Sequence, residues 1–264
     1  MYNLQEFLSV LEEFSPLFLS RKMVEKGAYD NSGIIVNNHS DINKIAFSLD
    51  LSIKAVEFAI NNGCDTIVTH HPAIYNPINN LGVDNSSKAL LLAVKNNLNI
   101  ISFHLNLDIT EGGIDSSLAS SFKGEIEGVL DRIYLEFGYG RKVKILKQNI
   151  DDFIDKLKEE LGSNKIIYYT NENCEKSIQN LASFCGAGSG DAVKMVEMGL
   201  DVDTIITSDI PHHNLLSLID GGKNVIVIPH YVSENYGFKK FYEWALQRTN
   251  GRAQAYYFAD KRFM

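Results

Sequence analysis

Short apolar runs alternate with amphipathic segments of about ten residues along much of this 264-residue chain, and that alternation restricts its fold. KIAFSLD (44–50), TIVTH (66–70) and NIISF (99–103) have the composition of strands. Between them, IKAVEFAINNG (53–63) and KALLLAVKNNL (88–98) have helical periodicity. Strands that alternate with helices of this length indicate parallel β-α-β units. We therefore expect an α/β fold.

The alternation returns in the last third of the chain, after a middle region of different character. The predicted elements from the middle onward are the strands YLEFG (134–138), RKVKIL (141–146), KIIYYT (165–170), 203–207 and 224–229, and the helices 151–162, 191–199 and 214–222. We predict two packed α/β lobes with similar βαβ units. Residues 1–124 and 229–264 form the first lobe and residues 125–228 the second, with no inserted third domain.

A weak internal repeat supports two related units. DTIVTHH (65–71) and DTIITSDIPHH (203–213) each follow a helix that ends in glycine, and each precedes a helix and an apolar strand. Duplication of one βαβ unit explains the match. The recurrence of such short sequences in unrelated α/β proteins explains it equally well.

Composition excludes several classes of protein. A net charge of −8 and isolated pairs of basic residues argue against nucleic-acid binding through a broad basic surface. No apolar run reaches 18 residues, so we expect no membrane span. The acidic, amphipathic N-terminus differs from a secretory signal. Cys64, Cys174 and Cys185 form no C-x-x-C pair, and a reduced, cytoplasmic location is the simplest expectation.

Histidines follow three of the predicted strands, at the points where the strands end. The carboxyl ends of parallel strands converge on one crevice in open α/β sheets. Two of these histidines have a carboxylate four residues later, on the same side of a helical turn. The resulting set of candidate metal ligands is His70, His71, His104, Asp108, His230 and Glu234. Six ligands are too many for one tetrahedral zinc with an open position, and they suit two metal ions that share carboxylates, in a cleft at the strand ends.

Other polar groups keep two interpretations. GAGSGD (186–191) forms either a tight turn with Asp191 as the helix N-cap or a loop that contacts a substrate phosphate. Asp209 and His213 either line the same cleft or cap the next helix. His39 and His212 are interpreted as ordinary loop histidines, and Cys185 as inert packing.

The order of the motifs resembles a known family along almost the whole chain. The matching segments are YDNSGIIV, THHP, FHLNLD followed by a Gly-Gly turn, SFCGAGSGD, TSDIPHH and PHYVSE. Together they resemble the NIF-three-like dinuclear-metal-centre hexamer family in its short form. Many members of that family carry the label type 2 GTP cyclohydrolase I homologue.

The resemblance implies ligands at the same six positions, with Asp209 and His213 lining the cavity. It also implies two divalent metal ions per subunit and a ring-shaped homohexamer. Leu105, Ser208 and Pro229 depart from the family pattern, and none of them is a proposed ligand. Ser208 takes the place of a glycine and could change the fit of a substrate.

The function expected from the resemblance is that of a dinuclear metal-dependent hydrolase. In a GTP cyclohydrolase-type reaction, a metal-activated water attacks C8 of guanine and formate is released. Glu234 or His213 could act catalytically by carrying the proton. A dinuclear phosphoesterase and a non-catalytic metal-binding or scaffold protein remain alternatives. Zn, Fe, Mn and Co all suit the mixed ligands, and the partner is a small molecule, such as a nucleotide.

Overall fold

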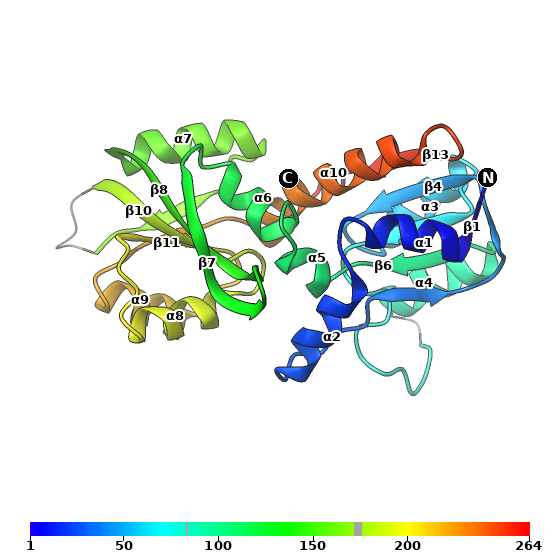
Figure 1. Cartoon of the computed structure of the whole chain (residues 1–264), viewed down its shortest axis with the longest axis horizontal. Coiled ribbons are helices and arrows are strands. Elements are labelled where there is room, and N and C mark those ends of the chain that lie inside the picture. Colours follow the sequence, from blue (N-terminus) through cyan, green and yellow to red (C-terminus); the bar gives the residue numbers. More distant parts are fainter. Residues whose placement is uncertain (83, 172–175) are drawn as a thin grey trace. The chain divides into compact units, whose positions relative to one another are not determined.

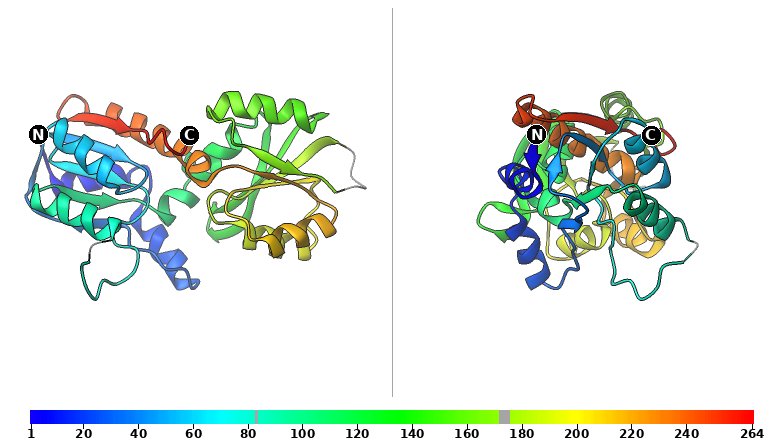
Figure 2. Two further views of the ribbon diagram at one scale, coloured as in Figure 1. Left: turned by 180° about the vertical axis from the view of Figure 1, so that it is seen from behind. Right: turned by 90° about the vertical axis from the view of Figure 1, so that its right-hand side faces the viewer.

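The structure is a computed structural model that describes residues 1–82, 84–171 and 176–264. The chain divides into two compact units, which are drawn in Figures 1 and 2. Unit 1 comprises residues 1–110 and 238–260, and unit 2 comprises residues 111–237 and 261–264. The boundaries predicted at 124/125 and 228/229 both fall inside unit 2. Unit 2 begins before residue 125 because α6 (Ile114–Ser120) packs against strands of this unit.

Unit 1 is built on a five-stranded sheet in the order β13-β4-β5-β6-β2. The strands are β13 (Gln254–Phe258), β4 (Lys44–Ser48), β5 (Thr66–Thr69), β6 (Asn99–Ser102) and β2 (Gly33–Val36). All neighbours are parallel except β2, which runs antiparallel to β6. A separate antiparallel pair joins β1 (Tyr2–Asn3) to β3 (Asp41–Ile42). The helices of this unit are α1 (Leu4–Glu12), α2 (Leu17–Glu25), α3 (Ile53–Asn61), α4 (Asn85–Lys95), α5 (Leu105–Ile109) and the second part of α10 (His230–Thr249).

Local sequence signals explain where α3 begins and ends. Ser52 precedes the helix, and its hydroxyl accepts a hydrogen bond from the N–H of Ala55 at 3.1 Å. Gly63 follows the helix with a φ of +64°, a conformation that glycine adopts without steric cost. The helix therefore returns the chain directly to β5.

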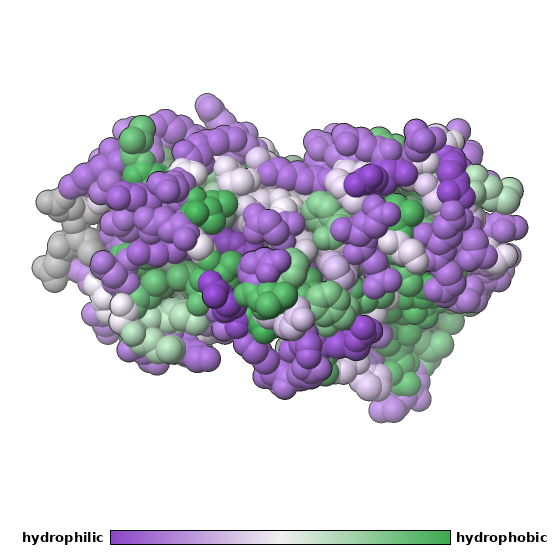
Figure 3. All heavy atoms as spheres, in the orientation of Figure 1, coloured by the Kyte–Doolittle hydropathy of each residue, from purple (hydrophilic) through white to green (hydrophobic). Residues whose placement is uncertain are grey.

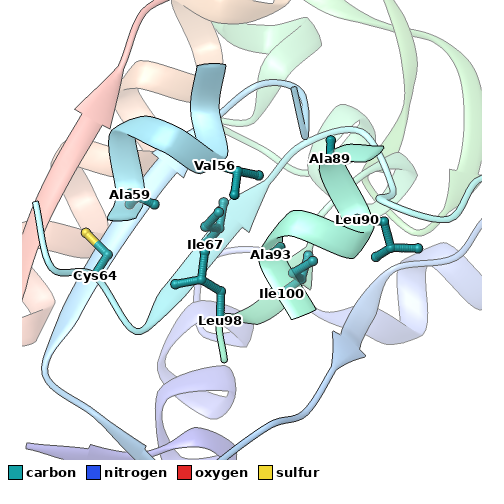
Figure 4. Close-up of a cluster of buried hydrophobic side chains, with 10 residues drawn as sticks. Val56, Ala59, Cys64, Ile67, Ala89, Leu90, Ala93, Leu98 and Ile100 are labelled. Carbon is teal, nitrogen blue, oxygen red and sulfur yellow. The ribbon is translucent and has the colours of Figure 1, made fainter. Parts of the chain in front are cut away.

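Alternate residues of the central strands fill two different cores in unit 1. Ala46, Ile67 and Ile100 pack against α3 and α4, in the cluster shown in Figure 4. On the other face, Phe47 lies against Phe241 of α10, with ring centroids 6.1 Å apart. Both faces of the sheet are therefore covered, which explains why its parallel strands are apolar runs.

Unit 2 contains a six-stranded sheet in the order β7-β8-β10-β11-β12-β9. The strands are β7 (Glu125–Tyr134), β8 (Phe137–Asn149), β10 (Ser177–Ser183), β11 (Thr204–Thr207), β12 (Asn224–Val227) and β9 (Ile167–Tyr169). Strands β10, β11 and β12 are parallel, and the others pair antiparallel. Helix α7 (Ile150–Leu161) covers one face of the sheet, and α8 (Ser189–Glu197) and α9 (His212–Asp220) cover the other (Figures 1 and 2).

In each unit, an aspartate just before a central parallel strand accepts backbone hydrogen bonds from the start of the neighbouring strand. In unit 1, Asp65 Oδ2 accepts the N–H groups of Asn43 and Lys44 at 2.7 and 3.1 Å, and the hydroxyl of Thr66 donates to its Oδ1. The carboxylate thus ties the start of β5 to the start of β4.

In unit 2, Asp203 occupies the corresponding position. Its Oδ2 accepts the N–H groups of Gln179 and Asn180 at 2.9 and 2.7 Å, and Thr204 donates to its Oδ1. The D-T pair of the internal repeat therefore makes the same contacts twice. The predicted α/β fold with similar βαβ units is confirmed.

Two local predictions were wrong, and one helix was largely missed. YLEFG is the turn of a hairpin instead of a strand, because Tyr134 pairs with Phe137 around Leu135, which has a φ of +49°. Helix α8 begins at Ser189 with Gly188 before it, so Asp191 lies in the first turn and is not the N-cap. Of the 20-residue helix α10, only the first turn, from His230 to Glu234, was predicted.

The described cysteines, Cys64 and Cys185, are free and buried, and Cys174 lies outside the described residues. Within the described ranges, no helix has both the length and the apolar character required to cross a membrane. On the face seen in Figure 3, hydrophilic side chains predominate, with hydrophobic ones between them.

Candidate metal centre

The end of β5 presents two imidazoles from consecutive residues of unit 1. The N–H groups of His70 and His71 both donate to the carbonyl oxygen of Leu49, at 3.1 and 3.0 Å. The hydroxyl of Thr69 donates to the carbonyl of His71 at 2.8 Å. These bonds fix the backbone where the strand stops. The side chain of His70 is fully buried, whereas that of His71 is partly exposed.

One ring nitrogen of each of these histidines is held by an oxygen atom. Nδ1 of His70 lies 2.8 Å from the carbonyl oxygen of Phe103, and Nδ1 of His71 lies 2.7 Å from Oδ1 of Asp50. An oxygen acceptor at Nδ1 favours the tautomer with its proton there, which leaves the Nε2 lone pair for a ligand.

The D-N-S-G segment holds the third histidine of unit 1. Nδ1 of His104 lies 2.7 Å from Oδ1 of Asp30, and its backbone N–H donates to the hydroxyl of Ser32 at 3.0 Å. Hydroxyl groups of Ser20 and Ser32 also donate to Asp30. Burial acts to raise the pKa of Asp30, but the hydrogen bond and charge of His104 and the two serine bonds hold that pKa below its usual value.

The three imidazoles form one cluster within unit 1. A ring nitrogen from each of His70, His71 and His104 lies within 4.8 Å of the others. Oδ1 of Asp108, on the short helix α5, lies 3.4 Å from Nε2 of His70. That oxygen is buried and accepts no hydrogen bond from the described residues. Three imidazoles and a carboxylate from two strand ends therefore lie together, as the sequence predicted for this part of the chain.

Unit 2 supplies a second, smaller group of donors at the start of α10. Nε2 of His230 lies 3.0 Å from Oε1 of Glu234, one helical turn later. Nδ1 of His230 lies 2.7 Å from Oδ2 of Asp209, which follows β11. Glu234 is buried, and the side chain of His230 is partly exposed. The four-residue spacing thus places imidazole and carboxylate on one side of the helix, as expected.

The glycine-rich loop packs directly on this carboxylate. A Cβ added at Gly186 would lie 2.3 Å from Oε1 of Glu234, and the φ of Gly186 is +56°. The N–H of Gly186 donates to the hydroxyl of Ser233 at 3.3 Å, and Ser208 donates to the same hydroxyl at 2.9 Å. Glycine is therefore required here for both conformation and space.

Comparison with known proteins places the chain in a family. The family model described as Duf34/NIF3 (NGG1p interacting factor 3) matches residues 2–258. The chain belongs to the Duf34/NIF3 family.

Relatives of this NIF3-family chain are similar to it along almost its whole length. A Methanocaldococcus jannaschii protein named "GTP cyclohydrolase 1 type 2 homolog" is 30% identical over 244 residues, which cover 91% of this chain and 93% of that protein. The structure of reduced HcgD from the same organism has a TM-score of 0.79, 27% identity and 97% coverage of both chains. A Bacillus cereus protein related to NIF3 has the same fold, with a TM-score of 0.84, 15% identity and coverage of 98% of this chain and 97% of its own.

Sequence reasoning missed two of the residues that orient imidazoles in this NIF3-family protein. Asp30 and Asp50 each hold a histidine, but both are distant in sequence from the histidine that they contact. An available signal was the D-N-S-G motif, which begins with Asp30 and was not assigned a role.

Two expected cavity residues have different positions in unit 2. Asp209 bonds the imidazole of His230, so it orients a predicted ligand. His213 is exposed on the first turn of α9, and it is absent from the described lining of the cleft beside His230.

Proposed function

We propose that this NIF3-family chain is a metal-dependent hydrolase that holds two divalent ions. The proposed ligands are His70, His71, His104, Asp108, His230 and Glu234. A ring-shaped homohexamer, implied by the family resemblance, is part of the same proposal.

One observation carries the proposal. All four histidines have Nδ1 within 2.7–2.8 Å of an oxygen atom, and in three of them that oxygen belongs to a carboxylate. Metal-binding histidines are typically held in this way, because the outer hydrogen bond fixes the tautomer and raises the basicity of the other nitrogen. The imidazole of His39 differs, because both of its ring nitrogens lie against backbone carbonyl oxygens, those of Asp41 and Asn97.

The chemistry of the donors fits divalent transition ions. Imidazole nitrogens and carboxylate oxygens suit Zn, Fe, Mn and Co, and two carboxylates can balance the charge of two ions. The buried Oδ1 of Asp108 accepts no hydrogen bond from any described residue, which is costly for a carboxylate that has only protein around it.

When bound, a pair of divalent ions supplies Lewis acidity and an activated water at neutral pH. Asp30, Asp50 and Asp209 hold the imidazoles in one orientation, so that little reorganisation is needed on substrate binding. We assign proton transfer to Glu234 or His213, as the sequence suggested. The names of the curated relatives support a nucleotide of the GTP type as the substrate.

Metal content tests the ligand assignment first. His70→Ala and Asp108→Ala should each lower the metal bound per chain, measured by elemental analysis after dialysis. His39→Ala is the matched control, because among the described residues that imidazole contacts the backbone carbonyls of Asp41 and Asn97 and the side-chain amide of Asn99, and no carboxylate. Wild-type metal content in both His70→Ala and Asp108→Ala would exclude the proposed ligand set.

Turnover tests the reaction. The protein loaded with Fe, Mn or Zn is incubated with GTP, other nucleotides and generic phosphoesters, and products are identified by mass. Formate release from GTP is the expected result. Phosphate release would identify a phosphoesterase instead. Survival of all substrates would favour a non-catalytic metal-binding protein.

A further inference from the structure

A cleft of about 480 Å³ lies beside His230 within unit 2. Strand β9, the end of β12, the segment after β11 and helix α9 form its walls. The lining residues are Ile167, Tyr169, Ser208, Asp209, Ile210, His212, Leu215, Val227, Ile228, Pro229 and His230. Asp209 and His230 are bonded to each other and both line the cleft, so the cleft borders the donor group of unit 2.

We infer that this cleft binds a planar heteroaromatic ring of the substrate, with Tyr169 as its stacking surface and His212 as a polar contact. The inference rests on the proposed function, because it names the part of the substrate that is held beside His230. It assigns a role to strand β9 and to His212, which the sequence motifs left unexplained.

The apolar side of the cleft is built by alternation along an edge strand. Ile167 and Tyr169 are separated by two positions on β9 and lie on one face of it, and both are exposed, at 51% and 41%. Val227 of β12 and Leu215 of α9 extend this apolar surface. An exposed tyrosine ring on an apolar wall offers a flat face on which a heterocycle can stack.

Polar residues form the smaller part of the lining. His212 is exposed at the first position of α9, and Ser208, Asp209 and His230 also line the cleft. An imidazole can donate or accept a hydrogen bond, so it can pair with a ring nitrogen or carbonyl. Apolar walls with a few placed polar groups are typical of small-molecule sites.

The charge of the lining favours a ring over a phosphate group. No Lys or Arg occurs among the described lining residues, whereas Asp209 contributes a carboxylate. An anionic group in this cleft would gain no charge-assisted hydrogen bond from a basic side chain. The heterocyclic part of a nucleotide therefore fits the cleft better than its phosphates.

Equilibrium binding tests the inference on the full-length, metal-loaded protein. The probes are guanosine 5′-monophosphate and ribose 5-phosphate, which lacks the ring, measured by calorimetry. Tyr169→Leu should weaken binding of the nucleotide by about tenfold or more, the effect of losing one stacking contact. Tyr169→Phe keeps the ring and should bind like the wild type.

Tyr168→Leu is the matched control. Tyr168 is the neighbouring residue on β9, and its hydroxyl bonds Asp151 of α7, away from the cleft. This variant should keep wild-type affinity, which shows that the loss in Tyr169→Leu does not come from damage to β9. His212→Ala should also weaken binding of the nucleotide.

Three results would overturn the inference: equal affinity of Tyr169→Leu and wild type, ribose 5-phosphate binding as tightly as the nucleotide, or no nucleotide binding by the wild type. The outcome is separable from that of the proposed function. Tyr169-dependent binding without turnover would retain the ring site and reject the hydrolase. Turnover that is unaffected in Tyr169→Leu would retain the hydrolase and reject the ring site.

Discussion

Three imidazoles of this protein are oriented by carboxylates that lie far in sequence from the histidines they contact. Asp50 follows β4, yet its carboxylate lies 2.7 Å from Nδ1 of His71, which follows β5. The charge favours the protonated Nδ1 and increases the electron density at Nε2. Single residues outside the histidine motifs therefore influence metal affinity.

Replacing Asp50 tests this effect. Asp50→Ala should lower metal affinity by about 10- to 100-fold, the usual consequence of losing an outer carboxylate. Metal titration with a competing chelator measures the change. Asp41→Ala is the control, since Asp41 is an exposed aspartate of the same unit. Equal affinities of the two variants would reject the orienting role of Asp50.

Gly186 provides a steric test in unit 2. In Gly186→Ala, the new Cβ would lie 2.3 Å from Oε1 of Glu234, and alanine at a φ of +56° costs about 1–2 kcal/mol. The carboxylate must move, so metal content should fall. Gly190→Ala should keep its metal, because nothing lies within 4 Å of its added Cβ. Elemental analysis measures the metal content of both variants. A normal metal content in Gly186→Ala would contradict the view that this loop positions the carboxylate of Glu234.

Cys64 predicts a pH dependence of stability. Burial, with a further contribution from the charge of Asp65, raises the pKa of the Cys64 thiol from 9.0 to about 11. The unfolded chain therefore loses this proton at lower pH than the folded protein does. The free energy of unfolding should fall as pH rises from about 9 to about 11. Urea unfolding of wild type and Cys64→Ala across this range isolates the effect, and parallel curves would refute it.

At the scale of elements, the ends of parallel strands and the start of α10 position the donors. His70 follows the end of β5 directly, His104 lies just beyond the end of β6, and α10 begins at His230. Helix α10 contributes its first turns to unit 2 and the remainder to unit 1. Its burial therefore changes along its length, which explains why no single apolar stripe marks it in the sequence.

Gly237 tests the packing of α10 within unit 2. In a solvent-exposed helix, Gly→Ala would stabilise by up to about 1 kcal/mol. Here the added Cβ would lie 2.7 Å from Cα of Ile114, in the backbone of α6. Gly237→Ala should therefore destabilise the protein, by about 1–3 kcal/mol. Chemical denaturation measures the change in the free energy of unfolding. A stabilised variant would show that α10 and α6 are not in close contact.

At the scale of the whole molecule, bound metal should stabilise the folded chain, because the unfolded chain holds no preformed site for the ions. A ligand that binds only the folded state adds about 2.7 kcal/mol at a free concentration of 100 times its Kd. Thermal unfolding should shift upward with added metal and downward with chelator. In His70→Ala the shift should be much smaller. A melting temperature that does not depend on metal would contradict the proposal.

Much of the fold was predictable because its signals are local. Strands β4, β5 and β6 and helices α3 and α4 follow from periodicity and from caps such as Ser52 and Gly63. The β7–β8 hairpin was misread because Leu135, at its turn, is apolar, and no glycine or proline marks the loop. Helix α10 was missed because its packing partners change along its length.

The sequence by itself determined many of the elements and the chemistry that they carry, since periodicity, caps and the spacing of His and acidic residues are properties of neighbouring positions. Only the tertiary structure decided which oxygen meets each imidazole. Asp30 and His104 are 74 positions apart, and Asp50 and His71 are 21 apart. Contacts of that kind depend on strand order and register, which no local pattern records. The tautomer of each histidine, and with it the chemistry at Nε2, is therefore set by the fold.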